Sequence, residues 1–109
     1  MTTDAAEPLH PSLTLEREEL AAFCSRRGIR RLSLFGSRLT GRHRPGSDVD
    51  LLVEFDPGRI PTLLDMADME QELGRKLGGL RVDLRTPGDL SRYFRDDVLR
   101  DAAAQYESR

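Results

Sequence analysis

The sequence predicts an α+β fold in which helices pack against a small mixed β-sheet. Stretches with apolar residues spaced three and four apart indicate helices, and shorter stretches in which apolar and polar residues alternate indicate strands. Their order is helix, strand, strand, helix, strand, helix. The connections between the strands are too short for a full doubly wound parallel sheet, and this favours the mixed arrangement.

The first half of the chain predicts one helix and two strands. The helix covers residues 14–27, with Thr14 as its N-cap and Gly28 directly after its last residue. Residues 29–35 and 48–55 follow as strands, since apolar positions recur in both and turn residues separate them. The lone cysteine excludes a disulfide within the chain, and we expect its thiol to be buried. The apolar stripe of the helix is formed by Leu15, Leu20, Phe23 and Cys24.

The second half predicts two helices around a third strand. Residues 62–77 form the first of these helices, and two consecutive glycines end it. Gly74 lies inside this helix, where glycine costs about 1 kcal/mol relative to alanine, and close packing is the only explanation that the sequence suggests. Residues 80–85 form the strand, and a closing helix is expected over residues 90–106. The stripe of that closing helix contains Leu90, Phe94, Val98 and Ala102, with Tyr93, Leu99 and Tyr106 beside it.

Length and composition limit the classes of function. The chain has 109 residues, and we predict a tail over residues 1–12 and a single domain over residues 13–109. The net charge is −2 and no block of Lys and Arg dominates, so direct nucleic-acid binding is not expected. Neither a signal peptide nor an apolar stretch of membrane-spanning length is recognisable, so we expect a cytoplasmic protein without membrane association.

Three aspartates are the candidate catalytic residues. Because side chains alternate along a strand, Asp48 and Asp50 share one face at the start of the second predicted strand. Asp83 lies between Val82 and Leu84 in the third strand, and its side chain leaves the sheet on the face opposite to theirs. If these two strands are neighbours, the three carboxylates converge.

Converging carboxylates predict a divalent cation. Two carboxylates this close repel each other, and a hard cation relieves that repulsion. Mg²⁺ prefers oxygen ligands and typically binds one or two carboxylates together with substrate phosphates. The arrangement therefore suits two-metal phosphoryl transfer, in which Asp83 either bridges to the second ion or accepts the proton of the attacking hydroxyl.

The Gly-Ser pair after the first strand is the candidate phosphate-binding turn. Gly36 lets the backbone approach a ligand closely, and the backbone N–H groups near Ser37 can face an anion. Arg38 or Arg42 would add positive charge for a triphosphate. Each feature alone has an ordinary structural explanation, because Asp-x-Asp and Gly-Ser occur in many solvated turns. Their order and their places in the predicted elements favour a catalytic site.

Other site classes find no support in the sequence. It contains neither the Walker-type phosphate loop nor the Gly-x-Ser-x-Gly turn of a hydrolase nucleophile. His10 and His43 are single histidines without the spacing of metal ligands, and we expect both to be exposed.

The Gly36-Ser37 turn, the Asp48-Val49-Asp50 segment and Asp83 together resemble the pattern of the minimal nucleotidyltransferase family. This family is a branch of the polymerase-β-like nucleotidyltransferase superfamily. The hallmark of that family is Gly-Ser, a short spacer, Asp-x-Asp, and a third Asp on a later strand. The basic spacer around His43 departs from the family's usual pattern, and this leaves the details of phosphate contact open. The segments that carry the resemblance are Phe35-Gly36-Ser37-Arg38, Gly46-Ser47-Asp48-Val49-Asp50-Leu51-Leu52-Val53-Glu54-Phe55 and Val82-Asp83-Leu84.

The resemblance assigns a role to each matching residue. Asp48 and Asp50 would bind Mg²⁺, and Asp83 would be the third metal-binding and catalytic carboxylate. Gly36 and Ser37, followed by Arg38, would bind the phosphates of ATP or another NTP. The fold implied is that of a minimal nucleotidyltransferase, with a small mixed sheet and helices packed against it.

The resemblance also implies a biological role. Many short members are antitoxins encoded beside a HEPN-domain ribonuclease toxin, and some transfer AMP from ATP onto a tyrosine of that toxin. We expect Mg²⁺-dependent transfer of NMP, first of all AMP, onto a hydroxyl of such a partner, with the oligomeric state left open. The alternative is a binding module that neutralises its partner by occlusion, with Tyr93, Phe94 and Leu99 as a contact face. Modification of a small drug is a third hypothesis, which the absence of a second domain disfavours.

Overall fold

The computed structural model describes residues 15–42, 44 and 48–108. The predicted tail over residues 1–12 and the predicted N-cap Thr14 lie outside this part of the chain. Within the described ranges, no helix combines the length and the apolar character that crossing a membrane requires. In chain order the elements are α1 (Arg17–Arg27), β1 (Ile29–Phe35), α2 (Ser37–Thr40), β2 (Val49–Phe55), α3 (Leu63–Lys76), β3 (Val82–Arg85), the 3₁₀ turn η2 (Pro87–Asp89), α4 (Arg95–Asp101) and β4 (Ala103–Glu107).

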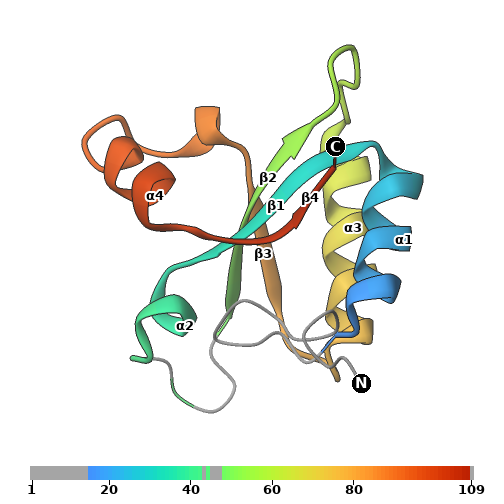
Figure 1. Ribbon diagram of the computed structural model, residues 1–109, viewed down its shortest axis with the longest axis horizontal. Helices are drawn as coiled ribbons and strands as arrows, with labels where there is room; N and C mark the ends of the chain where they lie inside the picture. Colours follow the sequence, from blue (N-terminus) through green and yellow to red (C-terminus); the bar gives the residue numbers. More distant parts are fainter. Residues whose placement is uncertain (1–14, 43, 45–47, 109) are drawn as a thin grey trace.

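One mixed sheet organises the molecule. Its strand order is β3-β2-β1-β4. β1 pairs antiparallel with β2 and with β4, whereas β2 and β3 pair parallel and are connected by α3. Helices α1 and α3 lie side by side on one side of the sheet, while α2 and α4 lie on the other (Figure 1). The predicted α+β class is confirmed.

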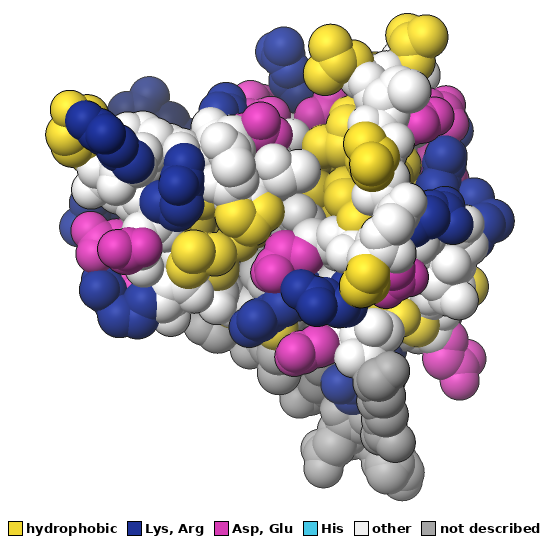
Figure 2. Space-filling view, turned by 90° about the horizontal axis from the view of Figure 1, so that it is seen from above, with side chains coloured by type: hydrophobic (Ala, Val, Ile, Leu, Met, Phe, Trp, Pro, Cys, Tyr) yellow, Lys and Arg dark blue, Asp and Glu magenta, His cyan; other side chains and the backbone are white. Residues whose placement is uncertain are grey.

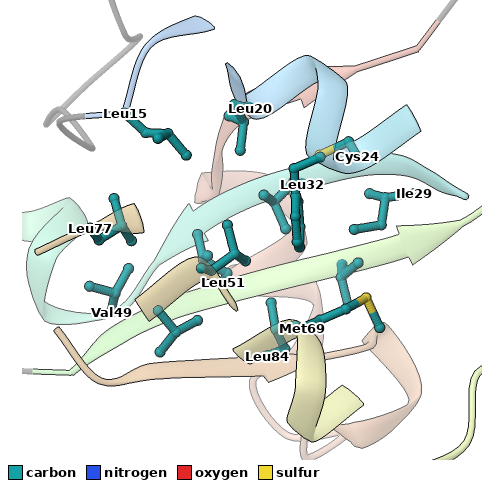
Figure 3. Packing of buried hydrophobic residues seen from close by; sticks show 14 of the residues in the cluster. Leu15, Leu20, Cys24, Ile29, Leu32, Val49, Leu51, Met69, Leu77 and Leu84 are labelled. Atoms are coloured by element: carbon teal, nitrogen blue, oxygen red, sulfur yellow. The ribbon is translucent and has the colours of Figure 1, made fainter. Parts of the chain in front are cut away.

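The main core lies between the sheet and the helices α1 and α3. In Figure 3, Cys24 of α1 and Met69 of α3 lie over Leu32 and Leu51 of the sheet, and none of the four is more than 2% exposed. Each buried aliphatic side chain of this size contributes about 1.5–3 kcal/mol to folding. Burial raises the pKa of the Cys24 thiol to about 12, so this cysteine is a neutral core residue, as predicted.

Both long helices have well-defined ends. Gly28 follows α1 in the left-handed conformation, with φ 72°, which glycine adopts without steric cost. At the start of α3, the Asp65 N–H donates to the Thr62 hydroxyl at 3.0 Å, and the Thr62 N–H donates to the Asp65 carboxylate at 2.8 Å. This reciprocal capping gives hydrogen-bond acceptors to two backbone N–H groups that would otherwise lack partners at the helix start.

The structure explains the glycine inside α3. A Cβ atom at Gly74 would lie 2.7 Å from the carbonyl oxygen of Leu80, which is closer than real Cβ contacts. The chain leaves α3 and turns back along it before β3 begins. Glycine is therefore required at position 74 by this close backbone approach. The low helix propensity of glycine is outweighed there by the clash that any side chain would cause.

The predicted closing helix over residues 90–106 is wrong. The helix there covers only Arg95–Asp101, and the following residues form β4, which pairs with the free edge of β1. An unpaired strand edge leaves backbone donors and acceptors without partners, and β4 satisfies them. Local propensity favours a helix here, because alanine is the strongest helix former and is depleted in strands, and the strand forms through its tertiary contact with β1. Three members of the predicted apolar pattern are exposed instead: Tyr93, Phe94 and Leu99.

Candidate active site

Two neighbouring parallel strands bring Asp50 and Asp83 together. The register of β2 and β3 places Asp50 directly opposite Asp83. Side chains alternate along each strand, so both carboxylates lie on the face turned away from α1 and α3. The condition that the sequence left open, adjacency of these two strands, is therefore met. The core residues that alternate with the two aspartates are Val49, Leu51, Val82 and Leu84.

Asp48 lies one residue before β2 and is exposed, rather than opening the strand as predicted. Its charge nevertheless reaches the site. The pKa of Asp50 is raised, first by burial of the carboxyl and then by the negative charges of Asp83 and Asp48. The three predicted carboxylates thus interact electrostatically, with Asp50 at the centre.

The Gly36 turn lies directly against the Asp50 carboxylate. Gly36 has φ 82° and follows Phe35, which is opposite Asp50 in the register of β1 and β2. A Cβ atom at Gly36 would collide with the carboxylate oxygen of Asp50. Glycine is therefore needed for its backbone conformation and for the space that Asp50 occupies.

Ser37 and Arg38, the other two predicted phosphate-binding residues, form the start of the short helix α2. The turn is held by backbone hydrogen bonds from Leu39 and Thr40 to the Gly36 carbonyl oxygen, at 3.1 and 3.3 Å. The structure therefore places the Gly-Ser turn and the aspartates at the same end of the sheet.

A cleft opens beside this turn, between α2 and α4. Its volume is about 380 Å³. The walls combine apolar side chains with two carboxylates of α4, and Arg100 of α4 pairs with both of these carboxylates, at 3.0 and 3.1 Å. The lining residues include Phe35, Leu39, Val98, Asp97 and Asp101.

Arg85 is a member of the site that the sequence reasoning missed. It follows Asp83 by two residues on β3, and its Nε donates a hydrogen bond to Asp83 Oδ2 at 3.2 Å. Strand alternation contains the signal, because residues 83 and 85 must share a face. The sequence alone does not reveal that the guanidinium folds back onto the carboxylate.

The donor set of the site suits Mg²⁺. Two carboxylates face each other across β2 and β3, and Mg²⁺ commonly takes one or two carboxylates and completes its shell with water and substrate phosphates. Among the described residues, no three acidic, histidine or cysteine side chains already form a complete metal-binding cluster. Burial, and after it the negative charges of Asp83 and Asp48, raises the pKa of Asp50, and a bound cation would offset both effects.

Comparison with known proteins decides the family. The family described as the nucleotidyltransferase domain matches residues 17–104. The chain belongs to this family. The nucleotidyltransferase is 38% identical over 95 residues to the protein adenylyltransferase MntA of Thermococcus cleftensis, a match that covers 87% of this chain and 90% of that relative.

Solved structures agree with the fold of the nucleotidyltransferase. A protein assigned as a minimal nucleotidyltransferase is 43% identical, with a TM-score of 0.64, and the match covers 79% of this chain and 85% of that one. A toxin–antitoxin complex crystallised with AMP-PNP contains a chain that is 18% identical, with a TM-score of 0.68, over 87% of this chain and 76% of that one. At this low identity the second match supports the fold alone.

Proposed function

We propose that this nucleotidyltransferase transfers AMP from ATP, with Mg²⁺, onto a hydroxyl of a protein acceptor. The observation that carries the proposal is the placement of Asp50 opposite Asp83, with the Gly36 turn against the Asp50 carboxylate. The similarity to a protein named as a protein adenylyltransferase supports ATP as the nucleotide and a protein as the acceptor.

Asp48, Asp50 and Asp83 would hold the metal. When bound, Mg²⁺ supplies charge for the triphosphate and lowers the pKa of the attacking hydroxyl. Asp50 and Asp83 are half-buried on the neighbouring strands β2 and β3, whereas Asp48 is exposed. Asp83, on the neighbouring strand, would either help to hold the metal or accept the proton of the acceptor hydroxyl.

Gly36, Ser37 and Arg38 would bind the phosphates of ATP. Gly36 brings the backbone next to Asp50, so a phosphate at this turn would lie beside the carboxylate that holds the metal. Arg38 follows within α2 and would contribute positive charge. The chain would thus orient the triphosphate between the turn and the aspartates.

The acceptor we propose is a tyrosine of a HEPN-domain ribonuclease toxin. Its support is the shared fold with one chain of a solved toxin–antitoxin complex, together with exposed apolar side chains around α4. Tyr93 is 85% exposed, Phe94 48% and Leu99 42%. We call these three residues the α4 apolar group. Figure 2 shows exposed apolar side chains among charged ones on the face viewed from above.

The cleft between α2 and α4 supports a protein acceptor. It borders the Gly36 turn, its walls combine apolar side chains with the carboxylates of Asp97 and Asp101, and its volume of about 380 Å³ is large enough for a single aromatic side chain. A partner that contacts the α4 apolar group would be placed at the edge of this cleft. Occlusion without catalysis is the alternative function, and the same exposed group would serve it.

The test is transfer of label from α-³²P-ATP to a co-expressed HEPN-domain toxin in the presence of Mg²⁺. Wild type and Glu18→Gln, an exposed change in α1, should label the toxin equally. Asp50→Asn and Asp83→Asn should both lose the labelled band while still binding the toxin. Labelling by Asp50→Asn at the wild-type rate would contradict the proposal. Tight binding by wild type without label under any nucleotide or metal would favour occlusion.

A further inference from the structure

Arg85 is a cation placed among the carboxylates of the site. Its Nε donates to Asp83 Oδ2 at 3.2 Å, and both side chains lie on the face of β3 that carries the site. We propose that Arg85 is a resident counter-ion of the catalytic carboxylates and competes with the divalent cation for Asp83. This inference rests on the proposed function, because it requires Asp83 to take part in metal binding.

The strand that carries Arg85 is anchored to α3, whereas the Arg85 side chain is partly exposed to solvent. The backbone N–H of Leu84 donates to Glu70 Oε2 of α3 at 2.8 Å, which anchors the outer edge of β3. The Arg85 side chain is 48% exposed, so its guanidinium can leave Asp83 towards solvent. The guanidinium can therefore exchange partners without a change in the fold.

The charge balance of the site gives this pairing a function. Asp48, Asp50 and Asp83 bring three like charges to the site, and Arg85, which contacts Asp83 at 3.2 Å, brings an opposite charge. Without metal, Arg85 thus compensates part of the repulsion among the carboxylates. When a divalent cation approaches, the positive charge of Arg85 repels it, and the guanidinium already bonds one oxygen of Asp83.

Removal of the Arg85 charge should therefore strengthen binding of free metal. Arg85→Gln is expected to bind Mg²⁺ about three to ten times more tightly than wild type, because water screens the repulsion at this partly exposed site. Arg85→Lys keeps the charge and should remain close to wild type. A purely structural role for Arg85 would predict the opposite, since looser aspartates bind metal less well.

The experiment measures metal binding without nucleotide. Free Mn²⁺ is followed by electron paramagnetic resonance during titration of the full chain, and Mg²⁺ affinity is obtained by competition. Arg75→Gln is the matched control, since it removes one positive charge from α3, on the other side of the sheet. Circular dichroism melting of each metal-free variant checks the fold.

The outcomes separate this inference from the proposed function. Tighter binding by Arg85→Gln, with Arg75→Gln unchanged, supports the resident counter-ion. Equal or weaker binding by Arg85→Gln would overturn it, as would equal tightening by Arg75→Gln or by Arg85→Lys. If Asp50→Asn binds metal as well as wild type does, the aspartates are not the metal site, and the proposed function itself fails.

Discussion

Asp50 and Asp83 lie directly opposite each other on the parallel strands β2 and β3. Two carboxylates in this position disfavour the folded state when both are ionised, since each repels the other and Asp50 is half-buried. Functional sites commonly keep charged groups that lower the free energy of unfolding, because the activity needs them. The proposed metal role accounts for it.

Asp50→Asn should separate activity from stability. We expect nucleotidyl transfer to fall by about 100-fold or more, the scale of removing a group that acts in the transition state. Because the change removes a half-buried, repelled charge, the melting temperature in metal-free buffer should equal or exceed that of wild type. Radiolabel transfer and differential scanning calorimetry measure the two effects. A large loss of thermal stability would show that Asp50 has a structural role instead.

Gly36→Ala should disrupt both the backbone and the site. The new Cβ would collide with the Asp50 carboxylate in addition to straining a residue at φ 82°. Gly41→Ala is a matched control, because Gly41 has φ 77° and a Cβ there would meet none of the described residues within 4 Å. We expect Gly41→Ala to cost about 1 kcal/mol and Gly36→Ala about 1–3 kcal/mol more. Urea unfolding compares the two, and equal costs would contradict the predicted contact with Asp50.

Glu72 should make stability depend on pH in the acidic range. Its carboxylate accepts hydrogen bonds from Arg26 at 2.6 Å and from Arg27 at 2.8 Å, and these contacts lower its pKa from 4.5 to about 2. A lowered pKa in the folded state stabilises the fold above the unfolded-state pKa. That contribution is lost as the pH falls from about 5 towards 2.

Glu72→Gln measures this contribution. The free energy of unfolding should fall by about 1 kcal/mol at pH 7, a modest value because water screens the partly exposed partners. The difference from wild type should shrink at pH 3, because Glu72 of the unfolded chain is protonated there and folding must release that proton. Urea unfolding at pH 7, 5 and 3 tests this, with Glu18→Gln as the control. A difference that is constant across this range would contradict the predicted linkage.

Leu99→Asp should weaken partner binding with little effect on folding. Leu99 belongs to the α4 apolar group and is 42% exposed, so a carboxylate there would remain hydrated in the isolated protein. We expect affinity for the toxin to fall by about tenfold or more, as for a residue central to an interface. Leu64→Asp, an 81% exposed position in α3, serves as the matched control. Unchanged affinity in a titration calorimetry experiment with Leu99→Asp would exclude this face.

Local sequence patterns were sufficient for the two long helices, the first three strands and the face that carries the aspartates. Helix and strand periodicities depend on neighbouring residues. Alternation along the strand alone places the Asp50 side chain on the opposite face of the sheet from Val49 and Leu51. The glycine after the first strand was also recognisable, although its collision with Asp50 was not. These features belong to the sequence because they need no knowledge of distant partners.

The tertiary structure decided what depends on residues far apart in the chain. The end of the chain became β4 rather than a helix, because the free edge of β1 offered backbone partners. The parallel register that sets Asp50 beside Asp83 arises only when α3 carries the chain back across the sheet. Arg85 and Asp83 lie on the same face of β3, but their ion pair also depends on the rotamers of both side chains. At a partly exposed site these rotamers depend on the surrounding charges, which the periodicity of the sequence does not show.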